Sequence, residues 1–391
     1  MFQLSFRAAL PLLPYREPKL LPSCAAISEV LLEKKPNAVL IVTTEGNERR
    51  GMIAPIEEAL REGGIPYAIF NKTRPDPTVE NVEEALALYR EKGCGMLIAV
   101  GGGSVLDCAK GVGARVAYPK KSLNKLAGVM RVMRKIPTLV AIPTTAGTGS
   151  EVTLAAVITD EKTHHKYAIM SFPLIPHYAV LDPKLTFTLP PHLTATTGMD
   201  ALTHAVEAYI GRSTTQKTRR LALEATALIF QNIEKAYADA HNEAARDAML
   251  HASYMAGVAF SMSYVGYVHA IAHSIGGRYG VPHGLANAVI LPNVLEAYGK
   301  SAHKKLHRLA IAAGVADEGD ALDIGAQKFI AAVRRLNASM EIPDTLKEIA
   351  PADIPDLAAN AAKEGNPLYP VPRLMNAEEL MPIYHRIAKG E

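Results

Sequence analysis

An aspartate and a histidine lie four residues apart in the second half of this 391-residue chain, within the segment Thr197-Gly-Met-Asp200-Ala-Leu-Thr-His204. Side chains at this spacing lie on the same face of a helix, and the face is otherwise apolar. A carboxylate oxygen and an imidazole nitrogen that converge on one point form half of a divalent-metal site. Taken alone, the pair is better explained by a hydrogen bond between the two side chains.

Three further histidines gather within fifteen positions downstream. His269 and His273 are again four residues apart on an apolar face, and His283 begins the next helix after a Gly-Val-Pro turn. Together with Asp200 and His204 they favour a metal site over a coincidence of core histidines. Spacing does not decide whether His269 or His273 is a ligand. The other nine histidines stand in polar surroundings and are expected to be solvated: 164, 165, 177, 192, 241, 251, 303, 307 and 385.

A glycine-rich turn in the first half joins an expected strand, 96–100, to an expected helix. The turn is Gly101-Gly102-Gly103-Ser104. Backbone N–H groups of such a turn, at the positive end of a helix dipole, favour a phosphate. The alternative needs no ligand: Ser104 would cap the helix, paired with Asp107 three residues later.

A second loop of small residues follows the expected strand 138–142. Parallel strands end at the same edge of a sheet, so both loops are expected to line one crevice for adenine, ribose and diphosphate. The loop offers four hydroxyls, those of Thr144, Thr145, Thr148 and Thr153.

The pattern around these motifs predicts two domains. Between residues 37 and 183, apolar β-branched runs at 38–43, 67–70, 96–100 and 138–142 alternate with helical patterns such as 78–93, capped by Thr78. This alternation is typical of a doubly wound α/β domain with a parallel sheet. Beyond Pro191 the chain is expected to be all-helical, with helices at 194–211, 215–238, 242–263, 266–278, 283–298 and 373–388. The predicted domains are residues 1–187 and 188–391.

Composition excludes several classes of protein. Lys and Arg total 42 against 39 for Asp and Glu, without a basic block, which argues against a nucleic-acid partner. No uncharged apolar run reaches the roughly 18–20 residues needed to cross a bilayer. The N-terminal segment, broken by Pro11 and Pro14, is a poor signal peptide. Three cysteines without framework spacing favour a cytoplasmic protein.

Four ordered motifs resemble those of the iron-containing (group III) alcohol dehydrogenase family. They are Gly-Gly-Gly-Ser-x-x-Asp-x-Ala-Lys at 101–110, Thr-Thr-Ala-Gly-Thr-Gly-Ser-Glu-Val-Thr at 144–153, Gly-Met-Asp-Ala-Leu-Thr-His-Ala at 198–205, and His-x-x-x-His with Pro-His-Gly at 269–284. The resemblance extends from about residue 30 to the C-terminus. It implies a dinucleotide-binding α/β domain, a helical domain, and an active site in the cleft between them.

The resemblance also implies residue roles. It makes Asp200, His204, His269 and His283 the metal ligands, and it makes His273 the catalytic residue near nicotinamide and substrate. The implied coenzyme-binding residues are Gly101, Gly102, Gly103, Ser104, Thr144, Thr145, Thr148, Thr153, Lys166 and Leu185.

The implied activity is that of a metal-dependent alcohol dehydrogenase or aldehyde reductase. Hydride would pass between NAD or NADP and a small alcohol or aldehyde, and the metal would polarise the substrate oxygen. The resemblance implies Fe²⁺, although the donor set also suits Zn²⁺. Dimers are common among relatives, so a homodimer or higher homo-oligomer is expected.

One departure leaves the coenzyme open. Many relatives carry an Asp after the first strand, where it binds the ribose 2′-OH and repels a 2′-phosphate. Here the matching residue is Thr44, followed by Glu45 and Gly46. Arg49 and Arg50 are candidate phosphate partners, although they are better explained as solvated charges near a helix start.

Other activities fit parts of the pattern. A glycerol-dehydrogenase-like polyol enzyme or a dehydroquinate-synthase-like lyase would share the fold. The lyase needs a basic pocket, whereas the residues near His269 are apolar: Phe260, Met262, Tyr264 and Tyr267. A metallohydrolase could use the same Asp and His residues but would leave the glycine turn unexplained. A metal- or nucleotide-binding protein without catalytic activity is a third alternative.

Overall fold

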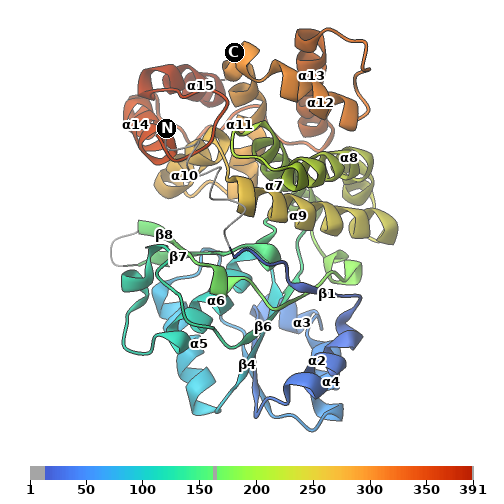
Figure 1. The fold of residues 1–391 in the computed structure, drawn as a ribbon, viewed down its shortest axis with the longest axis vertical. Helices are drawn as coiled ribbons and strands as arrows, with labels where there is room; N and C mark the ends of the chain where they lie inside the picture. Colours follow the sequence, from blue (N-terminus) through green and yellow to red (C-terminus); the bar gives the residue numbers. More distant parts are fainter. Residues whose placement is uncertain (1–13, 162–164, 390–391) are drawn as a thin grey trace. The chain divides into compact units, whose positions relative to one another are not determined.

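The computed structural model describes residues 14–161 and 165–389. It contains two compact units (Figure 1). One comprises Pro14–Thr145 and Gly149–Phe187, and the other comprises the chain from Thr188 onward together with Ala146–Thr148. Residues 1–13, which hold most of the segment judged a poor signal peptide, lie outside the described residues.

The first unit is built on a six-stranded, all-parallel sheet. Its order is β1 (Lys19–Leu21), β9 (Tyr178–Val180), β6 (Thr138–Pro143), β4 (Met96–Gly101), β2 (Val39–Val42) and β3 (Tyr67–Phe70). The strands expected at 38–43, 67–70, 96–100 and 138–142 are the central strands and one edge strand, so the predicted parallel sheet is confirmed. The short strands β1 and β9 have no counterpart in the expected pattern.

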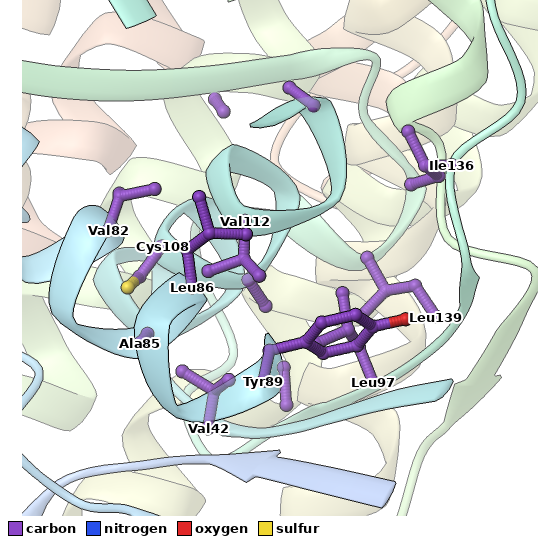
Figure 2. Close-up of a cluster of buried hydrophobic side chains, with 14 of the residues drawn as sticks. Val42, Val82, Ala85, Leu86, Tyr89, Leu97, Cys108, Val112, Ile136 and Leu139 are labelled. Carbon is purple, nitrogen blue, oxygen red and sulfur yellow. The ribbon is translucent and has the colours of Figure 1, made fainter. Parts of the chain in front are cut away.

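Helices cover both faces of this sheet, which explains why its strands are apolar throughout. On β2, Leu40 and Val42 pack toward α5 (Val79–Glu91) and α6 (Gly103–Ala117), as Figure 2 shows for Val42. The alternate residues, Val39 and Ile41, join a second core cluster. That second cluster includes residues of α2 (Ile27–Lys34) and α4 (Ala54–Glu62). Each fully buried side chain of this size contributes about 1.5–3 kcal/mol.

Several smaller elements complete the first unit. Helix α3 (Glu45–Arg49) follows β2, and Thr44 caps it by accepting from the Asn47 backbone N–H. A three-stranded sheet has the order β5 (Gly128–Val129), β8 (His165–Met170) and β7 (Ala155–Asp160), with β7 and β8 antiparallel. The 3-10 helices of the unit are η2 (Cys24–Ala26), η3 (Leu123–Leu126), η4 (Ser150–Val152), η5 (Phe172–Leu174) and η6 (Pro183–Thr186).

The second unit is helical, as predicted. Its helices are α7 (Pro191–Ile210), α8 (Gln216–Ala238), α9 (Glu243–Ser263), α10 (Tyr267–Tyr279), α11 (His283–Tyr298), α12 (His303–Ala312), α13 (Leu322–Ser339), α14 (Ile354–Gly365) and α15 (Ala377–Lys389), with η7 (Gly299–Ser301) and η8 (Pro351–Asp353). Helix α15 starts later than the expected residue 373. Asn376 and Glu379 exchange side-chain and backbone hydrogen bonds there, so a reciprocal cap sets the start.

Helices α7, α8 and α9 pack against one another, and α10 packs against α11 and α14 (Figure 1). Within residues 14–161 and 165–389, no single helix combines the length and apolar composition of a membrane span. Among the described helices, only the pair α9 and α10, bent by 99° at the break between them, meets those criteria jointly.

Candidate metal centre and dinucleotide-binding loop

Helix α7 presents three chemically active side chains on one buried face. Asp200, His204 and Glu207 follow at spacings of four and three residues, which align on one side of a helix. Their exposed fractions are 3%, 5% and 2%. Glu207 was not among the expected site residues, although its spacing from His204 was a usable signal.

The start of α11 lies very close to α7. A Cβ on Gly284 would stand 2.4 Å from the carbonyl oxygen of Thr196, so only glycine fits here without movement. His283 is the first residue of α11, as the sequence predicts. The close packing beside it therefore keeps the His283 imidazole near the carboxylate of Asp200, with 3.6 Å between Nε2 and Oδ1.

Three of the four expected metal ligands converge. Ligand atoms of Asp200, His269 and His283 all lie within 4.8 Å of one another. The fourth, His204, is not in this group: its ring stacks on His269 at 4.6 Å and on Phe260 at 4.1 Å between centroids. The His204 Nδ1 atom is buried and has no hydrogen-bond partner. One carboxylate, two converging imidazoles and a nearby unpartnered imidazole nitrogen fit a divalent cation.

Burial keeps the imidazoles in the form that binds metal. Desolvation lowers the pKa of His269 well below its usual value, and the neighbouring histidines lower it further. Burial also lowers the pKa of His204, against opposing effects of Asp200 and of a hydrogen bond with the Gly147 backbone. Both rings are therefore neutral at neutral pH, with a lone pair available for coordination.

Glu207 fixes the orientation of His269. Its Oε2 lies 2.6 Å from His269 Nδ1, which assigns the ring proton to Nδ1 and leaves Nε2 as the acceptor facing Asp200 and His283. The carboxylate also accepts from the backbone N–H groups of Gly266 and Val268, at 2.7 and 2.8 Å. Burial raises the pKa of Glu207 to about 7, against the opposing effect of these N–H donors.

His273 lies one turn beyond His269 and has different partners. Its ring stacks on His283 with 5.4 Å between centroids, and its side chain is 45% exposed. Its Nδ1 lies 2.7 Å from Glu364 Oε1, which also accepts from the Tyr369 hydroxyl. Burial of Glu364 acts to raise its pKa, but the hydrogen bonds from His273 and Tyr369 outweigh it and the pKa is lowered.

One expectation about a residue outside this group is wrong. His307 is buried rather than solvated, because its Nε2 is paired with the Asp317 carbonyl at 3.0 Å. Tyr267, expected among the apolar surroundings of His269, is a core residue whose hydroxyl lies 2.5 Å from Asn366 Oδ1 and 3.0 Å from the Met375 carbonyl.

In the first unit, the glycine turn leads into a helix without a side-chain cap. The N-cap of α6 is Gly102, and Ser104 is the second helical residue. The hydroxyl of Ser104 accepts from the backbone of Asp76, and Asp107 accepts from Ser150 and Val157. The ligand-free explanation, a Ser104–Asp107 cap, is therefore wrong. The dipole at this end of α6 remains available to an anion.

The two small-residue loops meet at the ends of adjacent strands. Residues Gly101 and Pro143 are paired in the β4–β6 register, and the Thr144 N–H donates to the Gly101 carbonyl at 3.1 Å. A Cβ on Gly102 would lie 3.4 Å from Thr145 Cγ2. Gly101, Gly102, Thr144 and Thr145 are thus brought together, as the sequence predicts.

A buried lysine holds the second loop against α6. Lys110 Nζ lies 2.8–2.9 Å from Ser150 Oγ, Thr153 Oγ1 and the Ala155 carbonyl. Burial lowers the pKa of this amine to about 8, although Asp107 and Glu151 oppose the shift. The Thr153 hydroxyl, expected to face the coenzyme, is engaged in this network. Lys110 itself was not among the expected site residues.

The remaining coenzyme candidates lie in varied surroundings. Lys166 lies in β8, and its Nζ is 2.7 Å from an oxygen of Asp76, whose backbone also bonds Ser104. Leu185 is 8% exposed and packs in the core cluster that contains Val39 and Ile41. Thr148 is partly buried and is grouped with the helical unit.

The end of β2 carries no carboxylate at position 44. Thr43 and Asn47 both donate to the Val100 carbonyl, which ties this end to β4. The Arg50 guanidinium donates to Asn47 Oδ1 at 2.9 Å and lies 3.4 Å from where a Cβ of Gly46 would be.

Residues 22–183 match the family model described as iron-containing alcohol dehydrogenase, and residues 194–388 match that of the C-terminal part of the Fe-containing alcohol dehydrogenase family. The chain belongs to the iron-containing alcohol dehydrogenase family. It is 40% identical to 1,3-propanediol dehydrogenase of Klebsiella pneumoniae over 89% of this chain and 90% of that protein. It is 37% identical to NADPH-dependent butanol dehydrogenase of Clostridium saccharobutylicum over 81% of each.

A crystal structure of 1,3-propanediol oxidoreductase superimposes with a TM-score of 0.92 and 37% identity, covering 95% of this chain and 99% of that one. The chain is thus an enzyme of the NAD(P)-dependent, iron-containing alcohol dehydrogenase family. The predicted class of activity, the predicted cofactors and the predicted α/β plus all-helical architecture are confirmed.

Replacing Glu207 with Gln is expected to weaken divalent-metal binding about 10- to 100-fold, because an amide is a poorer acceptor for the His269 ring proton. Competition with a chromogenic chelator measures the dissociation constant. Thermal unfolding of the metal-free variant is the control for folding. An unchanged dissociation constant would show that Glu207 only caps α10.

Gly284→Ala is expected to weaken metal binding at least about tenfold, because the new Cβ would overlap the Thr196 carbonyl and push His283 away from Asp200. Gly277→Ala is the matched control, since a Cβ at this helical position in α10 meets nothing within 4 Å. Equal metal affinities for the two variants would contradict the role given to the α7–α11 approach.

Proposed function

We propose that Asp200, His204, His269 and His283 hold the catalytic divalent metal. The observation that supports this most directly is the convergence of Asp200, His269 and His283 within 4.8 Å. The unpartnered Nδ1 of His204 supports a fourth ligand position after a side-chain adjustment. Fe²⁺ is the proposed ion, and Zn²⁺ also fits the donors.

The proposed reaction is reversible hydride transfer between NAD(P) and a small primary alcohol or its aldehyde. When bound, the metal polarises the substrate oxygen and the nicotinamide carries the hydride. His273 exchanges the hydroxyl proton with solvent. Two features support this role: its side chain is partly exposed, and its Nδ1 is held by Glu364, which leaves the other ring nitrogen for proton exchange.

Coenzyme binding is assigned to the glycine turn and the small-residue loops within residues 1–187. Gly101, Gly102, Gly103 and Ser104 seat the diphosphate, supported by the absence of a side-chain cap on α6. Further contacts are proposed for Thr144, Thr145, Thr148, Thr153, Lys166 and Leu185. Each site is assigned to one predicted domain, with coenzyme binding in residues 1–187 and metal binding in residues 188–391.

We further propose a cytoplasmic homodimer or higher homo-oligomer that acts on short-chain alcohols, including diols. The relatives named for 1,3-propanediol and butanol support this substrate size. Cys24, Cys94 and Cys108 are all free and buried, which supports a reducing compartment. Light scattering of the purified protein tests the oligomeric state.

The function is tested by an assay of the purified chain, loaded with Fe²⁺ or Zn²⁺, on a panel of alcohols and aldehydes with NADH and NADPH in parallel. Chelation is expected to abolish turnover. Asp200→Ala is expected to lose both metal and activity, and His273→Ala to keep the metal but lose about 10²-fold in kcat. Loss of metal from His273→Ala would mean that His273 is a ligand.

Thr44→Asp is expected to shift the ratio of kcat/KM for NADH over NADPH at least about tenfold toward NADH, because a carboxylate repels the 2′-phosphate. Aspartate is also a good N-cap, so α3 is preserved. Thr44→Asn, an uncharged cap, is the control and should keep the original ratio. An unchanged ratio in the aspartate variant would show that residue 44 does not face the ribose.

A further inference from the structure

Asn287 lies at the centre of the proposed metal ligands. It is the fourth residue after His283 on α11 and is fully buried. Its Nδ2 lies 2.7 Å from Asp200 Oδ1, 3.1 Å from His283 Nε2 and 3.4 Å from His269 Nε2. One amide nitrogen therefore contacts the ligand atom of each of the three converging residues.

The orientation of the Asn287 amide follows from these neighbours. Asp200 is an acceptor, and His269 has its proton on the Nδ1 that faces Glu207, so its Nε2 is also an acceptor. Turning the amide over would place its oxygen against these lone pairs. In the orientation observed, Oδ1 is buried and has no hydrogen-bond partner. The contacts to the ligands therefore outweigh the loss of a partner for the amide oxygen.

The same lone pairs cannot serve both the amide and a cation. An imidazole nitrogen has a single lone pair, whereas a carboxylate oxygen can accept from Asn287 and still coordinate a metal. Metal binding must therefore replace the contacts of Asn287 with His269 and His283, and it can leave the contact with Asp200 intact.

We propose that Asn287 is a placeholder for the metal: its amide holds the three ligands together in the metal-free chain and competes with the cation for them. This inference rests on the proposed metal site. It means that the metal-free protein keeps a folded, preorganised site, and that metal affinity is lower than the ligands alone would give, because binding breaks hydrogen bonds that the amide has already made.

The test uses the full chain with Co²⁺ as the probe metal. Asn287→Leu removes the donors and keeps the branched shape of the side chain at Cγ. Asn337→Leu is the matched control, because Asn337 is also a buried asparagine, with Nδ2 donating to the Ala288 carbonyl and an unpartnered Oδ1, but it touches no ligand. The Co²⁺ dissociation constant, the Co²⁺ absorption spectrum and the thermal midpoints with and without metal are measured.

Asn287→Leu is expected to lower the midpoint of the metal-free protein more than that of the Co²⁺ form, and to bind Co²⁺ about three- to tenfold more tightly with an unchanged spectrum. Asn337→Leu is expected to lower both midpoints equally and to leave the dissociation constant unchanged. Asn287→Asp provides a second variant: its carboxylate faces Asp200, so Co²⁺ binding should be at least about tenfold tighter and the spectrum should change.

Weaker Co²⁺ binding by Asn287→Leu, or equal shifts of both midpoints, would overturn the placeholder role and show that Asn287 supports the loaded site or only fills space. An Asn287→Asp variant with unaltered affinity and spectrum would overturn it as well. Failure of the unaltered chain to bind Co²⁺ would overturn the proposed metal site itself, and this inference with it.

Discussion

Three hydrogen-bond acceptors face one point in the helical unit, and most of the local packing follows from this. The Asp200 carboxylate and the Nε2 atoms of His269 and His283 repel one another unless something positive lies between them. The surrounding helices supply what this requires. Glu207 turns His269, Gly284 lets α11 approach α7, and Asn287 brings N–H donors to the shared point. The repulsion between these acceptors is thus offset by Glu207, Gly284 and Asn287, none of which is among the proposed metal ligands.

The first unit shows the opposite electrostatic arrangement. At the start of α6, backbone N–H groups and the positive end of the helix dipole face outward without a side-chain acceptor. The second loop is held against α6 by Lys110, which bonds Ser150 and Thr153. The start of α6 therefore keeps the N–H groups and the dipole that favour an anion, without a side-chain competitor.

Features set by local periodicity and capping could be predicted from the sequence. The bounds of α11 match the expected 283–298, and Thr78 caps α5 as expected. The apolar runs identify β2, β3, β4 and β6 because strands buried on both faces need no polar alternation. The pairing of β4 with β6 also places Gly101 opposite Pro143, since neighbouring parallel strands end at the same edge of the sheet.

Features set by contacts between distant helices could not be predicted from the sequence. Spacing places Glu207 on the face of Asp200 and Asn287 one turn from His283, but only the packing of α7, α10 and α11 shows what they bond. The burial of His307 likewise depends on the carbonyl of Asp317, ten residues away. Ser104 does not cap α6, because the helix already begins at Gly103 with Gly102 as its N-cap.

The short stretch Ala146–Thr148 belongs with the helical unit although the chain on both sides of it belongs with the sheet. A Cβ on Gly147 would lie 2.6 Å from the Thr197 carbonyl, and the Gly147 backbone bonds with His204. A fragment that begins at residue 188 would therefore lack Ala146–Thr148, a segment that packs with the helical unit. Chimaeras that exchange the two halves between relatives must carry matching versions of this stretch, because the boundary between the two units is not a single point along the chain.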